Sequence, residues 1–251
     1  MKGWLPFARK GKLPAGGNMR DQYAGDVSDY LKFAFLRRVV TPAETLGVAW
    51  WWLAGHDGRS DGRHDEYLTD SRWKVLDPKL FDMLAGRPAR DVAALEALDL
   101  WPARPVFHRE AVPGKRARSE WSAGMLTTLA PASIIFADPD NGVSRPGGVS
   151  PKSATIDEAL ALASRERPVL LIRFPHRLNS HDEQLAQYHT AFAAQRPVTV
   201  RTCVRVPNAN GSTSPRIRWF TALNPTPAIT AGIEAFASAV RLLPGAAASV
   251  N

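Results

Sequence analysis

Two segments with uninterrupted apolar centres, ASIIFAD at 132–138 and RPVLLIRF at 167–174, most strongly limit what this 251-residue chain can fold into. Both have the length of a strand, and neither alternates between apolar and polar residues. A strand without alternation is buried on both faces, which is typical of a parallel sheet with helices on each side. LGVAWWWLA at 46–54 is a third run of this kind.

Helical patterns separate these strands along the chain. We expect helices at 28–40, 78–98 with a break at Gly86–Pro88, 118–130, 155–166, 182–195 and 229–243. A further strand is expected at 104–112, and an antiparallel hairpin is expected from 197–207 and 215–225. The order predicts a doubly wound, mostly parallel α/β sheet that ends in an antiparallel hairpin. We expect one domain over 21–251 and a flexible basic arm over 1–20.

Polar loops follow the predicted strands, and ligands of such sheets bind beyond the carboxyl ends of the strands. The loop ADPDNG supplies Asp138, Asp140 and Asn141 after one strand, and the segment FPHR supplies His176 after the next. Asp, Pro, Asn and Gly are also the commonest turn residues, so a plain turn is the alternative. We predict that these four residues have catalytic roles.

A strip of charged residues begins the first predicted helix. Asp26, Asp29 and Lys32 are three residues apart, which places them along one side of a helix. Asp26 suits the N-cap position. Asp29 and Lys32 either form a surface ion pair or face the predicted cleft, in which case Asp29 joins the catalytic group.

The overall charge favours an anionic partner. The chain has 32 Lys and Arg against 24 Asp and Glu, a formal net charge of +8. Nucleic acid or a nucleotide is the simplest such partner. Four residues are predicted to bind the substrate: Arg118 and Trp121 as a clamp for a phosphate or a base, and Arg173 and Arg177 beside His176 as phosphate contacts.

Cysteine content and hydropathy indicate the cellular compartment. Cys203 is the only cysteine, so the chain forms no internal disulfide and has no cysteine-rich zinc site. No segment approaches the roughly 18 consecutive apolar residues of a membrane span. We therefore expect a cytoplasmic protein with no membrane partner; the oligomeric state is left open.

Three motifs carry a resemblance to a known family. YAGDVSDYLKF at 23–33, IIFADPDNG at 134–142 and WFTALNPTP at 219–227 resemble, in this order, motifs of the ribosomal RNA adenine-N6 methyltransferases that act on large-subunit RNA. The chain is also similar to an uncharacterised bacterial and phage family with GDxGDxxKxxLLR and FLDPDNG motifs. The resemblance implies a Rossmann-type methyltransferase fold.

The same resemblance implies a cofactor and its contacts. S-adenosylmethionine would be the cofactor, with Gly25, Lys32, Gly55 and Asp57 at its site and Lys32 on its carboxylate. Asp138 would accept a hydrogen bond from the target amine of a flipped-out base.

Two other functions stay open from the residues alone. Asp140 and Asn141 stand where the methyltransferase family has a proline and a tyrosine. Asp138 and Asp140 could instead hold Mg²⁺ in a nuclease or related phosphodiester hydrolase. Such an enzyme could act in phage defence. The third function is a non-catalytic module that binds nucleic acid.

Overall fold

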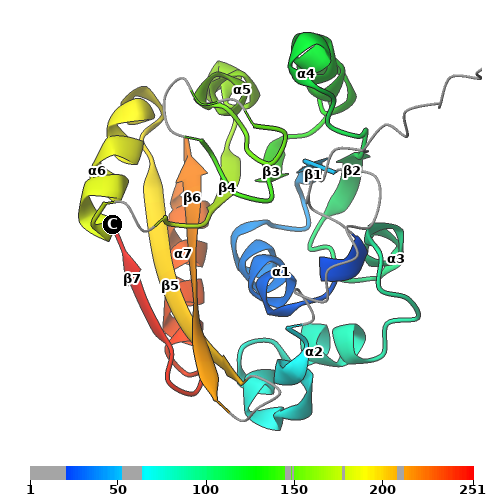
Figure 1. Ribbon diagram of the computed structural model, residues 1–251, viewed down its shortest axis with the longest axis vertical. Helices are drawn as coiled ribbons and strands as arrows, with labels where there is room; N and C mark the ends of the chain where they lie inside the picture. The colour runs from blue at the N-terminus through cyan, green and yellow to red at the C-terminus, as the bar shows by residue number, and fades with distance from the viewer. Residues whose placement is uncertain (1–20, 53–63, 145–147, 149, 177–178, 208–211) are drawn as a thin grey trace, which may run out of the picture.

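Seven strands form a single sheet in the order β2-β1-β3-β4-β6-β5-β7, as Figure 1 shows for the computed structural model. The structure describes residues 21–52, 64–144, 148, 150–176, 179–207 and 212–251. The strands are β1 (Thr45–Trp50), β2 (Arg104–His108), β3 (Ile134–Asp138), β4 (Val169–Arg173), β5 (Val198–Pro207), β6 (Thr213–Leu223) and β7 (Ala247–Val250).

The sheet is parallel at one side and antiparallel at the other. Strands β2, β1, β3 and β4 are parallel neighbours. Strand β6 is antiparallel to β4 and β5, and β7 is antiparallel to β5. The mixed α/β class and the C-terminal hairpin are confirmed, but the antiparallel part is larger than predicted. The extra strand, β7, is a short run of small residues that carries no strand signal.

Helices cover both faces of the sheet. The α-helices are α1 (Val27–Val39), α2 (Pro78–Ala85), α3 (Val92–Ala97), α4 (Arg118–Thr128), α5 (Ile156–Leu162), α6 (His181–Ala191) and α7 (Pro227–Val240). Short 3-10 helices lie at Asp21–Tyr23, Glu66–Thr69, Ser71–Val75, Lys115–Ala117, Ser164–Glu166 and Ala193–Gln195. One core cluster joins the sheet to α1, α2, α3 and α7, and a second joins it to α4, α5 and α6.

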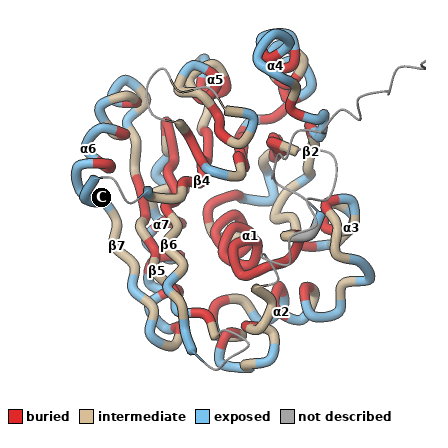
Figure 2. Tube along the Cα trace, in the orientation of Figure 1, coloured by how far each residue is buried: buried red, intermediate tan, exposed pale blue. Residues whose placement is uncertain are grey.

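Helix α1 is the central element of the first core. Its N-cap is Asp26, as predicted: the carboxylate accepts hydrogen bonds from the backbone N–H groups of Ser28 and Asp29 at 2.7 and 3.1 Å. Nearly every side chain of the helix is buried, and Figure 2 shows it as an almost continuous red segment. A helix buried all round belongs to the interior, so its polar residues Asp29 and Lys32 are held inside the protein.

The strand order places a switch point between β1 and β3. The chain leaves β1, forms β2 on one side of it, and returns to form β3 on its other side. Ligands of open α/β sheets bind outside the carboxyl ends of the strands at such a point. Trp50 and Asp138, the last residues of β1 and β3, are paired there in the parallel register.

The described residues form seven α-helices. No helix among them is both long enough and apolar enough to cross a bilayer.

Candidate functional site

Lys32 lies between two carboxylates at the switch point. Its Nζ is 2.9 Å from Oδ1 of Asp29 and 2.8 Å from Oδ2 of Asp138. All three side chains are buried, with Asp138 only 1% exposed. The structure therefore joins the charged strip of α1 to the end of β3, and three of the predicted site residues meet in one ion-pair triad.

The turn before α1 holds Asp29 in place. Oδ2 of Asp29 accepts a hydrogen bond from the backbone N–H of Gly25 at 2.8 Å. Gly25 adopts φ +76°, a left-handed conformation that suits glycine. Tyr67 donates from its hydroxyl to the Gly25 carbonyl at 3.1 Å. Gly25 thus reaches the site through its backbone, by orienting a carboxylate of the triad.

Burial dominates the electrostatics of this group. It raises the pKa of Asp138 to about 6, although the charge of Lys32 acts in the opposite direction. It likewise raises the pKa of Asp26, to about 6, with a further contribution from Asp29. Burial alone would lower the pKa of Lys32, but Asp138 and Asp29 outweigh it and raise that pKa. Lys32 therefore keeps its positive charge at neutral pH.

Arg218 on β6 is a second cation at this edge that sequence reasoning missed. Its guanidinium donates to Oγ of Ser28 from Nε at 3.0 Å and from Nη2 at 2.6 Å. It also lies over the ring of Phe174, 4.3 Å from the centroid. Burial lowers the pKa of Arg218 to about 10. No local pattern marks a mid-strand arginine as a site residue, so its position could come only from the fold.

A cavity of about 470 Å³ lies between the loops that follow β3 and β4. Asn141 and His176 line it together with Arg173, the last residue of β4. The side chain of His176 is exposed, and its backbone N–H donates to Oε1 of Gln184 at 3.0 Å. The structure thus brings three more predicted residues together, at a place separate from the Lys32 triad.

Gly142 allows the two loops to approach each other. It adopts φ +71°, and a Cβ built on it would lie 2.7 Å from the Cα of Arg173 and 2.9 Å from the carbonyl oxygen of Ile172. A larger residue would push the β3 loop away from β4. The glycine of ADPDNG is therefore required both by a turn and by a close approach to a neighbouring strand.

Asp138 and Arg173 lie on opposite faces of the sheet. Asp138 contacts α1, on the face of the first core cluster. Arg173 stacks on Tyr188 of α6, in the second cluster, with its guanidinium 4.8 Å from the ring centroid. Ala137 of β3 pairs with Leu171 of β4, so Asp138 is level with Ile172, and Arg173, the next residue on β4, points to the other face. The predicted site residues at the strand ends therefore form two groups, one on each face of the sheet.

Asp140 forms an ion pair with Lys152 in the structure. Its side chain is half-buried, and Oδ2 lies 3.8 Å from Nζ of Lys152. Among the described residues, no group of three or more His, Cys, Asp or Glu is placed to hold a metal ion.

Arg118 and Trp121 do not form the substrate clamp that the sequence suggested. Arg118 binds both oxygens of Glu158, at 2.5 and 2.9 Å, and donates to the carbonyl of Ser153 at 3.0 Å. Its guanidinium lies 4.7 Å from the ring centroid of Trp121, which packs in the second core cluster. Arg118 thus links α4 to α5, while Trp121 packs on Trp51 and His108 and donates to the Glu110 carbonyl at 3.1 Å.

Three predicted residues cannot be placed. Gly55, Asp57 and Arg177 lie outside the described residues. Their expected contacts with cofactor and substrate remain predictions.

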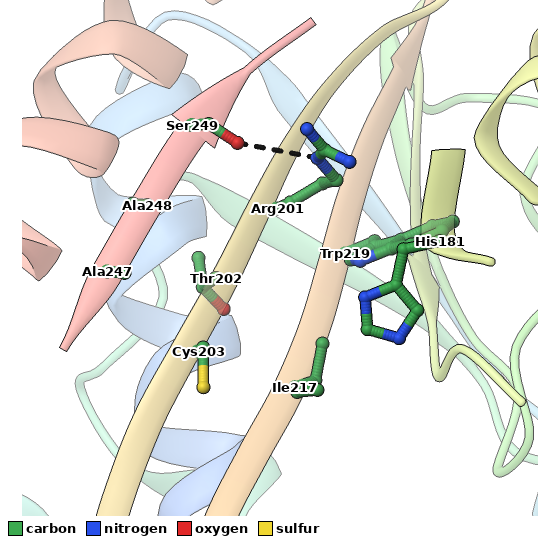
Figure 3. A pocket seen from close by; sticks show the side chains of 9 residues that line it. All are labelled: His181, Arg201, Thr202, Cys203, Ile217, Trp219, Ala247, Ala248 and Ser249. Atoms are coloured by element: carbon green, nitrogen blue, oxygen red, sulfur yellow. Dashed lines mark hydrogen bonds between the residues drawn. The ribbon is translucent and has the colours of Figure 1, made fainter. Parts of the chain in front are cut away.

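A smaller cavity, of about 230 Å³, lies against β5, β6 and β7 (Figure 3). Trp219 and His181 pack edge to face on one side of it, with ring centroids 5.7 Å apart. Arg201 donates from Nε to Oγ of Ser249 at 3.3 Å, the contact dashed in Figure 3. None of the predicted site residues lines this cavity.

Comparisons with known proteins found a distant structural likeness. No family model matches the chain, and no curated protein matches it. Among solved structures, it is similar to the crystal structure of protein LPL1258 from Legionella pneumophila, described with the family model DUF519. The identity is 12%, the match covers 91% of this chain and 97% of the other, and the TM-score is 0.43.

Proposed function

We propose that the protein is an S-adenosylmethionine-dependent enzyme of methyltransferase-like fold that transfers a methyl group to an amine of a nucleotide or nucleic acid. The observation that carries this proposal is the buried contact between Lys32 and Asp138 at the switch point of the sheet. A carboxylate at this position can accept a hydrogen bond from an amine that is being methylated. The net charge of +8 favours an anionic acceptor.

Asp138 has one carboxylate oxygen left to contact the molecule that receives the methyl group. Lys32 binds Oδ2, while Oδ1 accepts no hydrogen bond from a described residue. The amine of a base would donate to Oδ1, and ionised Asp138 would draw electron density toward the amine nitrogen. Lys32 and Asp29 are positioning residues in this scheme, since they fix the carboxylate without meeting the acceptor.

The charges at the triad fit one part of the cofactor and not another. Asp29 and Asp138 already surround the ammonium of Lys32, so the cofactor carboxylate would be a third anion around one cation. The expected contact between Lys32 and that carboxylate therefore does not fit. The acidic side chains Asp26, Asp29 and Asp138 instead suit the positively charged amino and sulfonium groups of the cofactor. When bound, S-adenosylmethionine supplies an electrophilic methyl group.

Binding and transfer can be measured separately. Calorimetry with S-adenosylmethionine and S-adenosylhomocysteine should give heat of binding for the wild-type chain and for Asp138→Asn. Transfer of a labelled methyl group to single-stranded RNA, DNA or nucleotides should fall about 100-fold or more in Asp138→Asn, the scale of a lost acid–base contact. No heat with either compound would overturn the proposal.

A second candidate is a metal-dependent phosphodiester hydrolase. The observation for it is that two buried carboxylates, Asp29 and Asp138, already enclose one cation, Lys32. Mg²⁺ would have to displace that ammonium to use the same oxygens. Cleavage of RNA or DNA that requires Mg²⁺ or Mn²⁺ and is lost in Asp138→Asn would favour this candidate. Salt-dependent nucleic-acid binding that is unchanged in Asp138→Asn, without transfer or cleavage, would indicate a non-catalytic module.

A further inference from the structure

Two arginines of this chain are equally buried but differ in their partners. Arg118 and Arg173 are each 7% exposed, and each lies against an aromatic ring. Arg118 has Glu158 as its counter-charge. Arg173 forms no ion pair with any described residue, and its Nε is buried without a hydrogen-bond partner there. A buried guanidinium without an anion is unusual, because burial of an unpaired charge is costly.

Aromatic rings hold Arg173 in position. Its guanidinium lies 4.8 Å from the ring centroid of Tyr188 and 5.8 Å from that of Trp219, its partner across the β4–β6 register. Such contacts stabilise a cation through the ring faces and leave its N–H donors unused. Trp219 also lines the smaller cavity in Figure 3.

The surroundings of Arg173 suit an anion. Arg173 lines the cavity of about 470 Å³, a size in the range of small-ligand sites. The other polar side chains in the lining come from Asn141, Ser144, Ser153 and His176, and no carboxylate is among them. The nearest acid in sequence, Asp140, instead lies 3.8 Å from Lys152.

We propose that this cavity is a phosphate-binding site in which the guanidinium of Arg173 is the main anion contact. Arginine presents paired N–H donors that match phosphate oxygens, and Asn141 and His176 at the rim supply further donors. The inference rests on the proposed function and deepens it, because it identifies the acceptor as a phosphorylated molecule. The phosphate is either the monoester of a nucleotide or a diester within a single strand.

The test titrates the full-length chain with inorganic phosphate, AMP and a short single-stranded RNA at low salt. AMP binding should weaken about 10-fold or more in Arg173→Met, since a hydrogen bond to a charged group is lost. Asn141→Asp should also weaken it, by placing a negative charge at the cavity. Asn141 is exposed, so this variant keeps the test valid if Arg173→Met fails to fold. Arg201→Met is the matched control: it removes the same charge and should bind AMP as the wild type does.

The outcomes separate the two sources of phosphate. Binding of AMP and inorganic phosphate indicates a monoester site, and binding of the RNA alone indicates a diester site. Absence of binding by all three at millimolar concentration would overturn the inference, as would equal affinities in wild type, Arg173→Met and Asn141→Asp. Heat from S-adenosylmethionine is recorded on the same samples. Heat from S-adenosylmethionine without phosphate binding refutes only the phosphate site. Normal AMP binding without heat from S-adenosylmethionine refutes only the cofactor assignment.

Discussion

Lys32 and Asp138 are 106 residues apart in the chain and form a buried ion pair of 2.8 Å. One comes from a helix that covers the sheet and the other from the end of a central strand. The contact therefore forms only when α1 has packed on the sheet, and it couples the stability of the fold to the geometry of the candidate site.

Removal of the Lys32 cation should strongly destabilise the protein. Lys32→Met leaves Asp29 and Asp138 buried without their shared counter-charge, and we expect a loss of about 3–5 kcal/mol in the free energy of unfolding. Urea denaturation at neutral pH measures this. Asp138→Asn added to Lys32→Met should recover part of the loss, because one of the two unpaired charges is gone. A single variant as stable as the wild type would contradict the role of the ion pair.

Stability should fall as the pH rises through the raised pKa of Asp138. Burial raises this pKa from 3.8 to about 6, so the folded state binds a proton more tightly than the unfolded state between these values. The stabilisation from protonation is complete below pH 3.8 and is lost as the pH passes about 6. The contribution of Asp138 between about pH 4.5 and 7.5 is on the order of 2 kcal/mol.

Comparison of wild type with Asp138→Asn isolates that contribution. Unfolding free energies measured across the same pH range should show a steeper decline for the wild type. Parallel pH profiles for the two proteins would show that Asp138 titrates alike in the folded and unfolded states. Asp26, whose pKa is also raised to about 6, is present in both proteins.

Gly142→Ala should destabilise the junction between the two loops. The substitution combines a strained φ of +71° with a Cβ 2.7 Å from the Cα of Arg173. We expect a loss of about 2 kcal/mol or more, measured by thermal or urea unfolding. Gly114→Ala is the control, since this position is exposed and a Cβ there meets nothing within 4 Å, and it should change the free energy of unfolding by less than about 0.5 kcal/mol. Similar losses in both variants would show that the loops do not require the close approach.

The Arg118–Glu158 pair should affect stability and not binding. Glu158→Gln leaves Arg118 buried without its counter-charge, with an expected loss of about 3 kcal/mol in the free energy of unfolding. Glu234→Gln, at an exposed position of α7, should change it by less than about 0.5 kcal/mol. AMP affinity should be the same in both variants. Weaker AMP binding in folded Glu158→Gln would show that Arg118 contributes to substrate binding.

Much of the fold could be predicted from local sequence. The segments 132–138 and 167–174 became β3 and β4 because uninterrupted apolar runs leave few alternatives to a buried strand. Thr155 and Glu158 have the sequence spacing of a capping box and form one at the start of α5. Strand β7 could not be predicted, since its Ala and Ser residues form a strand only through the edge that β5 offers them.

The site was less predictable because its contacts are long-range. Asp29, Lys32 and Asp138 could each be selected, but no spacing in the sequence indicates that Lys32 meets Asp138. Arg118 and Arg173 look alike in the sequence, as arginines near the ends of elements. Only the fold shows that one has a carboxylate beside it and the other does not.

The placement of Asp138 and Arg173 on opposite faces of the sheet sets the shape of any ligand that reaches both. A flat, rigid molecule can occupy one side of the sheet edge only. A molecule that joins the two must bend over the loop at Gly142, as a base and a phosphate linked through a flexible sugar can. Small fragments that bind on either side should therefore not compete with each other, and a flexible linker between two such fragments should give a tighter ligand than either alone.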